Sequence, residues 1–204
     1  MFKIILISIL SFSSINLYAK QLDININFES GFEFESQARL IKNLQKMQSV
    51  SDIEKLIKDQ DWIQDFSIIS KPFGNKIFIN IKNKKPIFVL NNQFFYDENL
   101  NKFSFDMSKR DLIHVESSEN NLQEILQIIN LVSSRYATRK IVYSYAKGWE
   151  IFTDSTVIRF GKELSDTKIQ NFIDTSNYLF ENGKIPSIID IRYKDGVALN
   201  YGTE

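Results

Sequence analysis

The sequence predicts an α+β protein, with a short apolar segment at 1–19 followed by domains at 20–86 and 87–204. Two observations support this prediction. Of the 204 residues, 43% are hydrophobic and 13% are aromatic, which is enough to build a substantial core. Apolar residues alternate with polar ones in several short stretches, as in half-buried strands, and recur at helical spacing in others. The two periodicities together favour sheets covered by helices.

Residues 1–19 are typical of a segment that meets the export machinery. Lys3 is followed by an uncharged, mostly apolar run from Ile4 to Ala19. As a helix this run would be about 24 Å long, shorter than a hydrocarbon core of roughly 30 Å, and Leu17–Ala19 resembles a cleavage site. Because a bilayer also thins around a short span, the residues alone are compatible with a cleaved signal or a retained anchor. The rest of the chain is expected outside the cytoplasm.

Residues 20–86 predict a small β-α-α-β-β domain. Its two helices must cover one face of a three-stranded sheet. The second helix is expected to start at a capping box, Ser51–Glu54. Trp62 lies where this helix turns into the sheet, so we expect its side chain to be buried. The remaining expected elements are a strand at 22–28, a helix at 38–47 and strands at 66–71 and 77–82.

Residues 87–204 predict a mostly antiparallel sheet with helices on one side. Turn sequences separate short alternating stretches, as in hairpins and a three-stranded meander. Apolar stripes predict helices at 122–132 and after Ser165, and the second stripe, ending at Phe180, is expected to face the core. The expected strands are 87–90, 94–96, 141–145, 149–153, 156–160, 188–193 and 197–201.

Composition limits the classes of function. The 25 basic and 25 acidic residues give a net charge of zero, so the chain lacks the positive field with which proteins hold nucleic acid. The absence of cysteine excludes disulfides and thiol nucleophiles, and a single histidine leaves few metal ligands. We therefore predict no nucleic-acid partner, no cofactor and no metal site.

Motifs in both domains follow a specific order along residues 60–201. The first domain carries Asp61–Ile68, Lys71-Pro72, Lys76–Ile81 and Lys85–Ile87. The second domain carries Gly148–Ile151, Phe160–Leu164, Lys168–Phe172 and Ile189–Leu199. In this order the motifs resemble the FtsQ/DivIB family of bacterial cell-division proteins, in which a POTRA domain precedes a β domain. Tyr201 departs from the family pattern, since an indole is often found there.

This resemblance implies a non-enzymatic scaffold that links early and late division proteins at the septum. The implied protein crosses the inner membrane once, keeps residues 1–19 as its anchor and places the rest of the chain in the periplasm. Its implied partners are the FtsB and FtsL pair. The alternative is a POTRA-bearing module of an outer-membrane assembly or secretion pathway. Such proteins ordinarily continue into a β-barrel, for which we expect no room in 204 residues.

The last strand, expected at Val197–Tyr201, is the predicted partner-binding site. It lacks the Lys and Pro residues that usually blunt an exposed edge, so a partner could add a strand there, unless another strand of the same sheet pairs with it. By the resemblance, the added strand belongs to FtsB. The predicted contact residues are Tyr193, Gly196, Val197, Ala198, Leu199, Asn200 and Tyr201.

A periplasmic enzyme is the third possibility. His114 lies near Asp111, Ser104 and Ser108, which could be combined into a hydrolytic triad. No nucleophile motif accompanies these residues. We therefore predict no catalytic residue and place His114 in a loop or at a strand edge.

Overall fold

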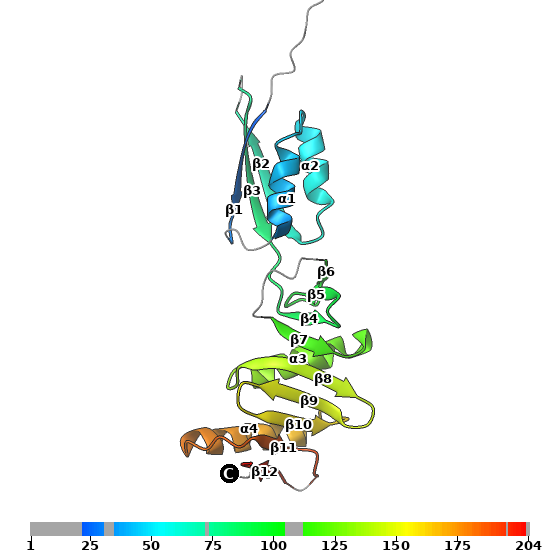
Figure 1. The fold of residues 1–204 in the computed structure, drawn as a ribbon, viewed down its shortest axis with the longest axis vertical. Helices are drawn as coiled ribbons and strands as arrows, with labels where there is room; N and C mark the ends of the chain where they lie inside the picture. Colours follow the sequence, from blue (N-terminus) through cyan, green and yellow to red (C-terminus); the bar gives the residue numbers. More distant parts are fainter. Residues whose placement is uncertain (1–21, 31–34, 72–73, 105–111, 195, 203–204) are drawn as a thin grey trace, which may run out of the picture.

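The structure, a computed structural model, describes residues 22–30, 35–71, 74–104, 112–194 and 196–202. Its strands and helices form an α+β fold with one sheet of three strands and one of nine. The sheets follow each other along the long axis of the molecule, and the last strand, β12 (Ala198–Asn200), lies at the end far from the first sheet (Figure 1). The α+β class predicted from the sequence is confirmed.

The first sheet has the predicted β-α-α-β-β order. Its middle strand, β3, is parallel to β1 and antiparallel to β2. Both helices lie beside the sheet (Figure 1) and pack their apolar residues against alternate residues of β3, as the sequence periodicities predict. The elements are β1 (Asp23–Phe28), α1 (Glu35–Leu44), α2 (Val50–Lys58), β2 (Ile63–Ser70) and β3 (Lys76–Asn83).

Helix α2 begins earlier than the sequence predicts. The N-cap is Ser49, whose hydroxyl accepts a hydrogen bond from the Asp52 backbone N–H at 3.1 Å. Ser51 lies within the first turn of the helix, so the capping box expected at Ser51–Glu54 is wrong. Both serines have an acidic residue three positions later, but the extended backbone of Ser49 makes it the cap.

The predicted burial of Trp62 is confirmed. Its side chain is 3% exposed, and its ring centroid lies 6.4 Å from that of Phe28. The indole fills the corner between α2 and β2, where it joins the cluster formed by the two helices and the sheet. The same cluster continues past residue 86 and includes Val89, Phe95, Phe103 and Leu112.

The second sheet is mixed. Its strand order is β12-β11-β10-β9-β8-β7-β4-β5-β6. Its elements are β4 (Phe88–Leu90), β5 (Phe94–Tyr96), β6 (Lys102–Phe103), β7 (Ile113–Glu116), a 3-10 helix (Glu119–Asn121), α3 (Leu122–Val132), β8 (Thr138–Ser144), β9 (Gly148–Thr153), β10 (Val157–Gly161), α4 (Asp166–Glu181), β11 (Ile188–Asp190) and β12.

The predicted hairpins and meander form the antiparallel part of this sheet. Three pairs are parallel instead: β4 with β7, β7 with β8 and β10 with β11. Two of these pairs are strands joined through a helix, α3 or α4, which returns the chain to the end of the sheet where the previous strand began. The other five pairs of the described sheet are antiparallel, as the prediction of a mostly antiparallel sheet requires. The two parallel pairs of β7 were not predicted, because 113–116 was not recognised as a strand.

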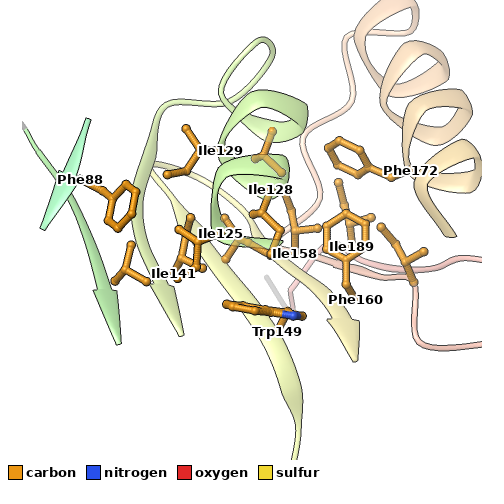
Figure 2. Packing of buried hydrophobic residues seen from close by; sticks show 14 of the residues in the cluster. Phe88, Ile125, Ile128, Ile129, Ile141, Trp149, Ile158, Phe160, Phe172 and Ile189 are labelled. Carbon is orange, nitrogen blue, oxygen red and sulfur yellow. The ribbon is translucent and has the colours of Figure 1, made fainter. Parts of the chain in front are cut away.

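Helices α3 and α4 pack into one hydrophobic cluster with the strands of the second sheet. Figure 2 shows Ile125 and Ile128 of α3 above the strands, with Phe172 of α4 close to Phe160 and Ile189. Trp149 lies at the base of this cluster, fully buried, and its indole N–H donates to Glu124 Oε2 at 2.9 Å.

The end of α4 differs from the prediction. Phe172, Ser176 and Leu179 are buried as expected, but the Phe180 side chain is 86% exposed. Helix α4 extends past the strands that it covers (Figure 1), and in its last turn Leu179 still packs on the core cluster, whereas Phe180 does not. The expectation that Phe180 faces the core is therefore wrong.

The segment predicted to enter the membrane, 1–19, lies outside the described residues. Within the described ranges, no helix combines the length and the hydrophobicity needed to cross a bilayer.

Candidate functional site

The closing hairpin is present, but its strands are shorter than predicted. β11 covers 188–190 instead of 188–193, and β12 covers 198–200 instead of 197–201. Strand β11 ends where the Asp190 carboxylate accepts hydrogen bonds from the Arg192 backbone N–H at 3.1 Å and from its guanidinium Nε at 2.8 Å. The Arg192 N–H is then no longer free for the sheet.

The hydrogen bonds between β10 and β11 show which way the backbone of β11 faces. The Val157 N–H donates to the Ser187 carbonyl at 2.9 Å, and the Ile191 N–H donates to the Arg159 carbonyl at 2.8 Å. In a strand, the N–H and C=O of one residue point to the same side, and successive residues point to opposite sides. Ser187, Ile189 and Ile191 therefore direct their backbone groups toward β10.

It follows that Ile188 and Asp190, which alternate with these residues, direct their backbone N–H and C=O groups toward β12. Their register partners are Asn200 and Ala198, whose backbone groups must face β11 in return. Leu199, between them, is left with its N–H and C=O directed away from the sheet. Among the described strands, none pairs on that side of β12. Among the described strands, Leu199 is thus the residue of β12 whose backbone groups have no strand to pair with.

The side chains of the predicted contact residues divide between the two faces of the hairpin. Val197 and Leu199 are half-buried and pack on the core cluster, whereas Ala198 and Asn200 are exposed on the opposite face. The Asn200 carbonyl also accepts from Ser187 Oγ at 2.9 Å, which fixes this end of the strand. Within β12 itself, the exposed side chains are therefore those of Ala198 and Asn200.

Two exposed aromatic residues flank β12. Tyr193 is 56% exposed in the loop before the strand, and Tyr201 is 54% exposed directly after it. In the same loop, a Cβ built on Gly196 would touch nothing within 4 Å, so packing within the described chain does not require glycine there. The structure thus places the predicted contact residues on one hairpin, with Tyr193 and Tyr201 at its two ends.

A row of charged side chains runs across the sheet toward Ala198. The strand register aligns Glu150, Arg159, Asp190 and Ala198 on neighbouring strands. Arg159 Nε lies 3.1 Å from Glu150 Oε1, and Arg192 pairs with Asp190. Burial alone would raise the pKa of Asp190, but hydrogen bonds from Arg192 and attraction to Arg159 hold it below its usual range. Asp190 is therefore a buried carboxylate that stays ionised.

The residues considered for a hydrolytic triad do not form one among the described residues. His114 lies in β7, an interior strand between β4 and β8, so its predicted place in a loop or at an edge is wrong. Its Nδ1 is 3.0 Å from Asn92 Oδ1. The backbone N–H of Ser104 donates to Asp61, while Ser108 and Asp111 lie outside the described residues. In the same described ranges, no group of three or more Asp, Glu or His side chains could hold a metal ion.

Sequence analysis missed two features of the site. The outward direction of the Leu199 backbone depends on the parallel pairing of β10 with β11, which no local pattern contains. The exposure of Phe180 had one signal, its place in the last helical turn before Asn182-Gly183. Neither a scan against protein-family models nor a search of the curated proteins gives a match for this chain.

Proposed function

We propose that this protein is a non-enzymatic scaffold of the bacterial division machinery, and that it captures a partner by adding an extended segment of that partner to β12. The observation that carries the proposal is the edge of the nine-stranded sheet, where Leu199 directs its backbone groups away from β11. Strand addition supplies affinity through main-chain hydrogen bonds, and side chains beside the strand supply specificity. Tyr193 and Tyr201 are the side chains placed to do so.

The identity of the partner comes from the resemblance to the FtsQ/DivIB family. We assign the added strand to the extracytoplasmic part of an FtsB-type protein, acting together with an FtsL-type protein. In this proposal residues 1–19 anchor the chain in the inner membrane, 20–86 form a POTRA-like domain and 87–204 form an FtsQ-type β domain at the septum. The β-α-α-β-β order of the first sheet and the edge position of β12 support these assignments.

The test removes the outward backbone donor without removing the strand. Leu199→Pro deletes the N–H that faces the partner, and proline is tolerated where an edge donor faces solvent. Leu199→Ala is the matched control, because it also loses the half-buried side chain but keeps the N–H. Binding of the full chain to the extracytoplasmic segment of the FtsB-type protein is measured by isothermal titration calorimetry, and folding by circular dichroism.

We expect Leu199→Pro to fold but to lose binding to the FtsB-type segment, while Leu199→Ala keeps most of its affinity for that segment. Ala198→Pro should instead weaken the fold, because the Ala198 N–H faces Asp190 of β11. A folded Leu199→Pro chain that binds as tightly as Leu199→Ala would contradict strand addition at β12. A parental chain that does not bind the segment at all would refute the assigned partner.

A further inference from the structure

A groove lies near β12, between the C-terminal half of α4 and the turn that joins β9 to β10. It encloses about 350 Å³, a volume at the lower end of the range for small-ligand pockets. Its walls come from α4, from the segment 183–186 that leads into β11, and from the chain just after α3. The lining residues that matter below are Arg135, Ser176, Phe180, Lys184 and Ile185.

Exposed apolar side chains concentrate around this groove. Phe180 is 86% exposed and Ile185 is 70% exposed. Contiguous exposed apolar surface marks interaction sites in soluble proteins, so the groove favours an apolar occupant. Of the eight large hydrophobic side chains that are exposed in the described part of the chain, five lie on the end of α4, just after it or on the closing hairpin: Tyr178, Phe180, Ile185, Tyr193 and Tyr201.

A buried hydroxyl without a partner lines the groove. Ser176 is 1% exposed, and its Oγ makes no hydrogen bond within the described structure. Buried polar groups are nearly always hydrogen-bonded, because an unpaired one loses its bonds to water without replacement. A carbonyl or carboxylate oxygen of an occupant would accept a hydrogen bond from this hydroxyl. The occupant is therefore better described as a peptide than as a pure hydrocarbon.

The rim of the groove is positively charged. Arg135 donates to Asn177 Oδ1 at 2.9 Å, and Lys184 donates to the Tyr178 hydroxyl at 3.1 Å. Neither cation belongs to an ion pair of the described residues, and none of the described lining residues is acidic. The bond to Tyr178 raises the pKa of Lys184, and Tyr201 contributes less, so the ammonium group stays charged. Acidic side chains of a partner would complement this rim.

We propose that the groove holds an apolar side chain, with an acidic neighbour, from the same partner segment that adds to β12. The inference rests on the proposed function. Continuity supports it, because Ser187, which directly follows the groove residue Pro186, donates to the Asn200 carbonyl of β12 at 2.9 Å. The partner residues that flank the added strand at its Tyr201 end then insert beside α4. The segment is held twice, by backbone pairing and by side-chain insertion.

Site-specific photo-cross-linking in cells tests the two contacts separately. A benzophenone amino acid replaces Phe180 in the groove, Tyr193 at the hairpin or Ile69 on β2, and the full chain is produced with a tagged FtsB-type protein. Ile69 is the control, because it is 56% exposed but belongs to the first sheet. We expect adducts from positions 180 and 193 and none from position 69. Mass spectrometry should place the adduct from position 180 on residues that flank the strand.

Affinity measurements provide the second arm. Phe180→Ser and Lys184→Glu should each weaken binding of the full chain to the FtsB-type segment by about 10-fold or more, as for residues at the centre of an interface. The matched controls, Ile69→Ser and Lys55→Glu on the first sheet and its helix, should bind like the parent. The effect of Lys184→Glu should shrink at high salt, because it depends on charge.

The outcomes separate this inference from the proposed function. An adduct from position 193 without one from position 180, together with unchanged affinity of the groove variants, would overturn the groove contact and leave strand addition intact. Absence of adducts from both positions would overturn both. Adducts from both positions, with weaker binding of the groove variants alone, would establish the two-point contact.

Discussion

The outer strands β2 and β12 are both sheet edges, but their chemistry differs. β2 carries a register shift between Ile63 and Asp65, and the Asp65 carboxylate accepts a hydrogen bond from the Phe66 N–H at 2.8 Å. That donor faces outward, because the Lys71 N–H faces β3 and residues alternate along the strand. The Asp65 carboxylate thus caps one outward donor of β2, whereas no described strand pairs with β12 on the outer side of Leu199.

The two edges therefore differ in how readily a strand of another molecule could pair with them. Bulges and local side-chain hydrogen bonds are common ways to prevent strands of different molecules from pairing. Their presence on β2 shows that this sequence can protect an edge where the fold leaves one. The backbone of Leu199 in β12 lacks such a cap among the described residues, which is compatible with the proposed strand addition. The predictions below concern substitutions near β2 and near β12.

The largest expected effect is on the β2 side, at Trp62. Its indole fills the corner where α2 turns into β2, and it is 3% exposed. Trp62→Ala should lower the free energy of unfolding by about 3–5 kcal/mol, because it leaves a cavity in the cluster. Urea unfolding of the full chain, followed by circular dichroism, measures the loss. A change below about 1 kcal/mol would show that the corner does not depend on this side chain.

The strands, the hairpins and the burial of Trp62 could be predicted from the sequence, because each depends on residues that are close together in the chain. The periodic apolar residues that indicate a strand lie within each of the short stretches 22–28 and 77–82. The turn residues Asn91–Gln93 likewise lie directly between the two strands of a hairpin. The burial of Trp62 follows from its place between a helix and a strand.

The features that the sequence did not predict depend on contacts between residues that are far apart in the chain. Strand β7 has four residues, and its pairing with β4 and β8 is set by a crossover through α3 rather than by its own pattern. The outward direction of Leu199 requires the pairing of β10 with β11 across α4. The groove arises because α4 extends past the sheet, which the spacing of its apolar residues does not reveal.

A smaller effect is expected on the β12 side, at Asp190. Its buried carboxylate accepts two kinds of hydrogen bond from Arg192 where β11 ends. Asp190→Asn should lower the free energy of unfolding by about 1–2 kcal/mol, the lower part of the range for bonds to charged groups, because Arg192 is partly exposed. Thermal and urea unfolding of the two chains at pH 6 give the difference. Equal stability would mean that the ion pair does not hold the hairpin.

The same residue predicts a direction for the pH dependence. Because the pKa of Asp190 is lower in the folded chain than in the unfolded chain, its ionisation stabilises the fold above the unfolded value of about 3.9. This stabilisation is lost as the pH falls through the lower folded pKa. Between pH 6 and pH 3, the parent should therefore lose more stability than Asp190→Asn. Parallel pH profiles for the two chains would contradict this assignment.

The smallest effect on stability, and the most direct test of the comparison, is expected at Asp65. Asp65→Ala frees the outward N–H of Phe66 and makes β2 more like β12, while the exposed position of Asp65 keeps the change in stability within about 0.5 kcal/mol. Asp65→Asn is the matched control, because its amide oxygen can still accept the hydrogen bond. Both changes are made in the Leu199→Pro chain, so that pairing through β12 does not contribute. Sedimentation velocity should then detect concentration-dependent association for Asp65→Ala and none for Asp65→Asn. If Asp65→Ala stays monomeric, the register shift between Ile63 and Asp65 protects the edge without the carboxylate, and the contrast with β12 depends on strand geometry rather than on a capped donor.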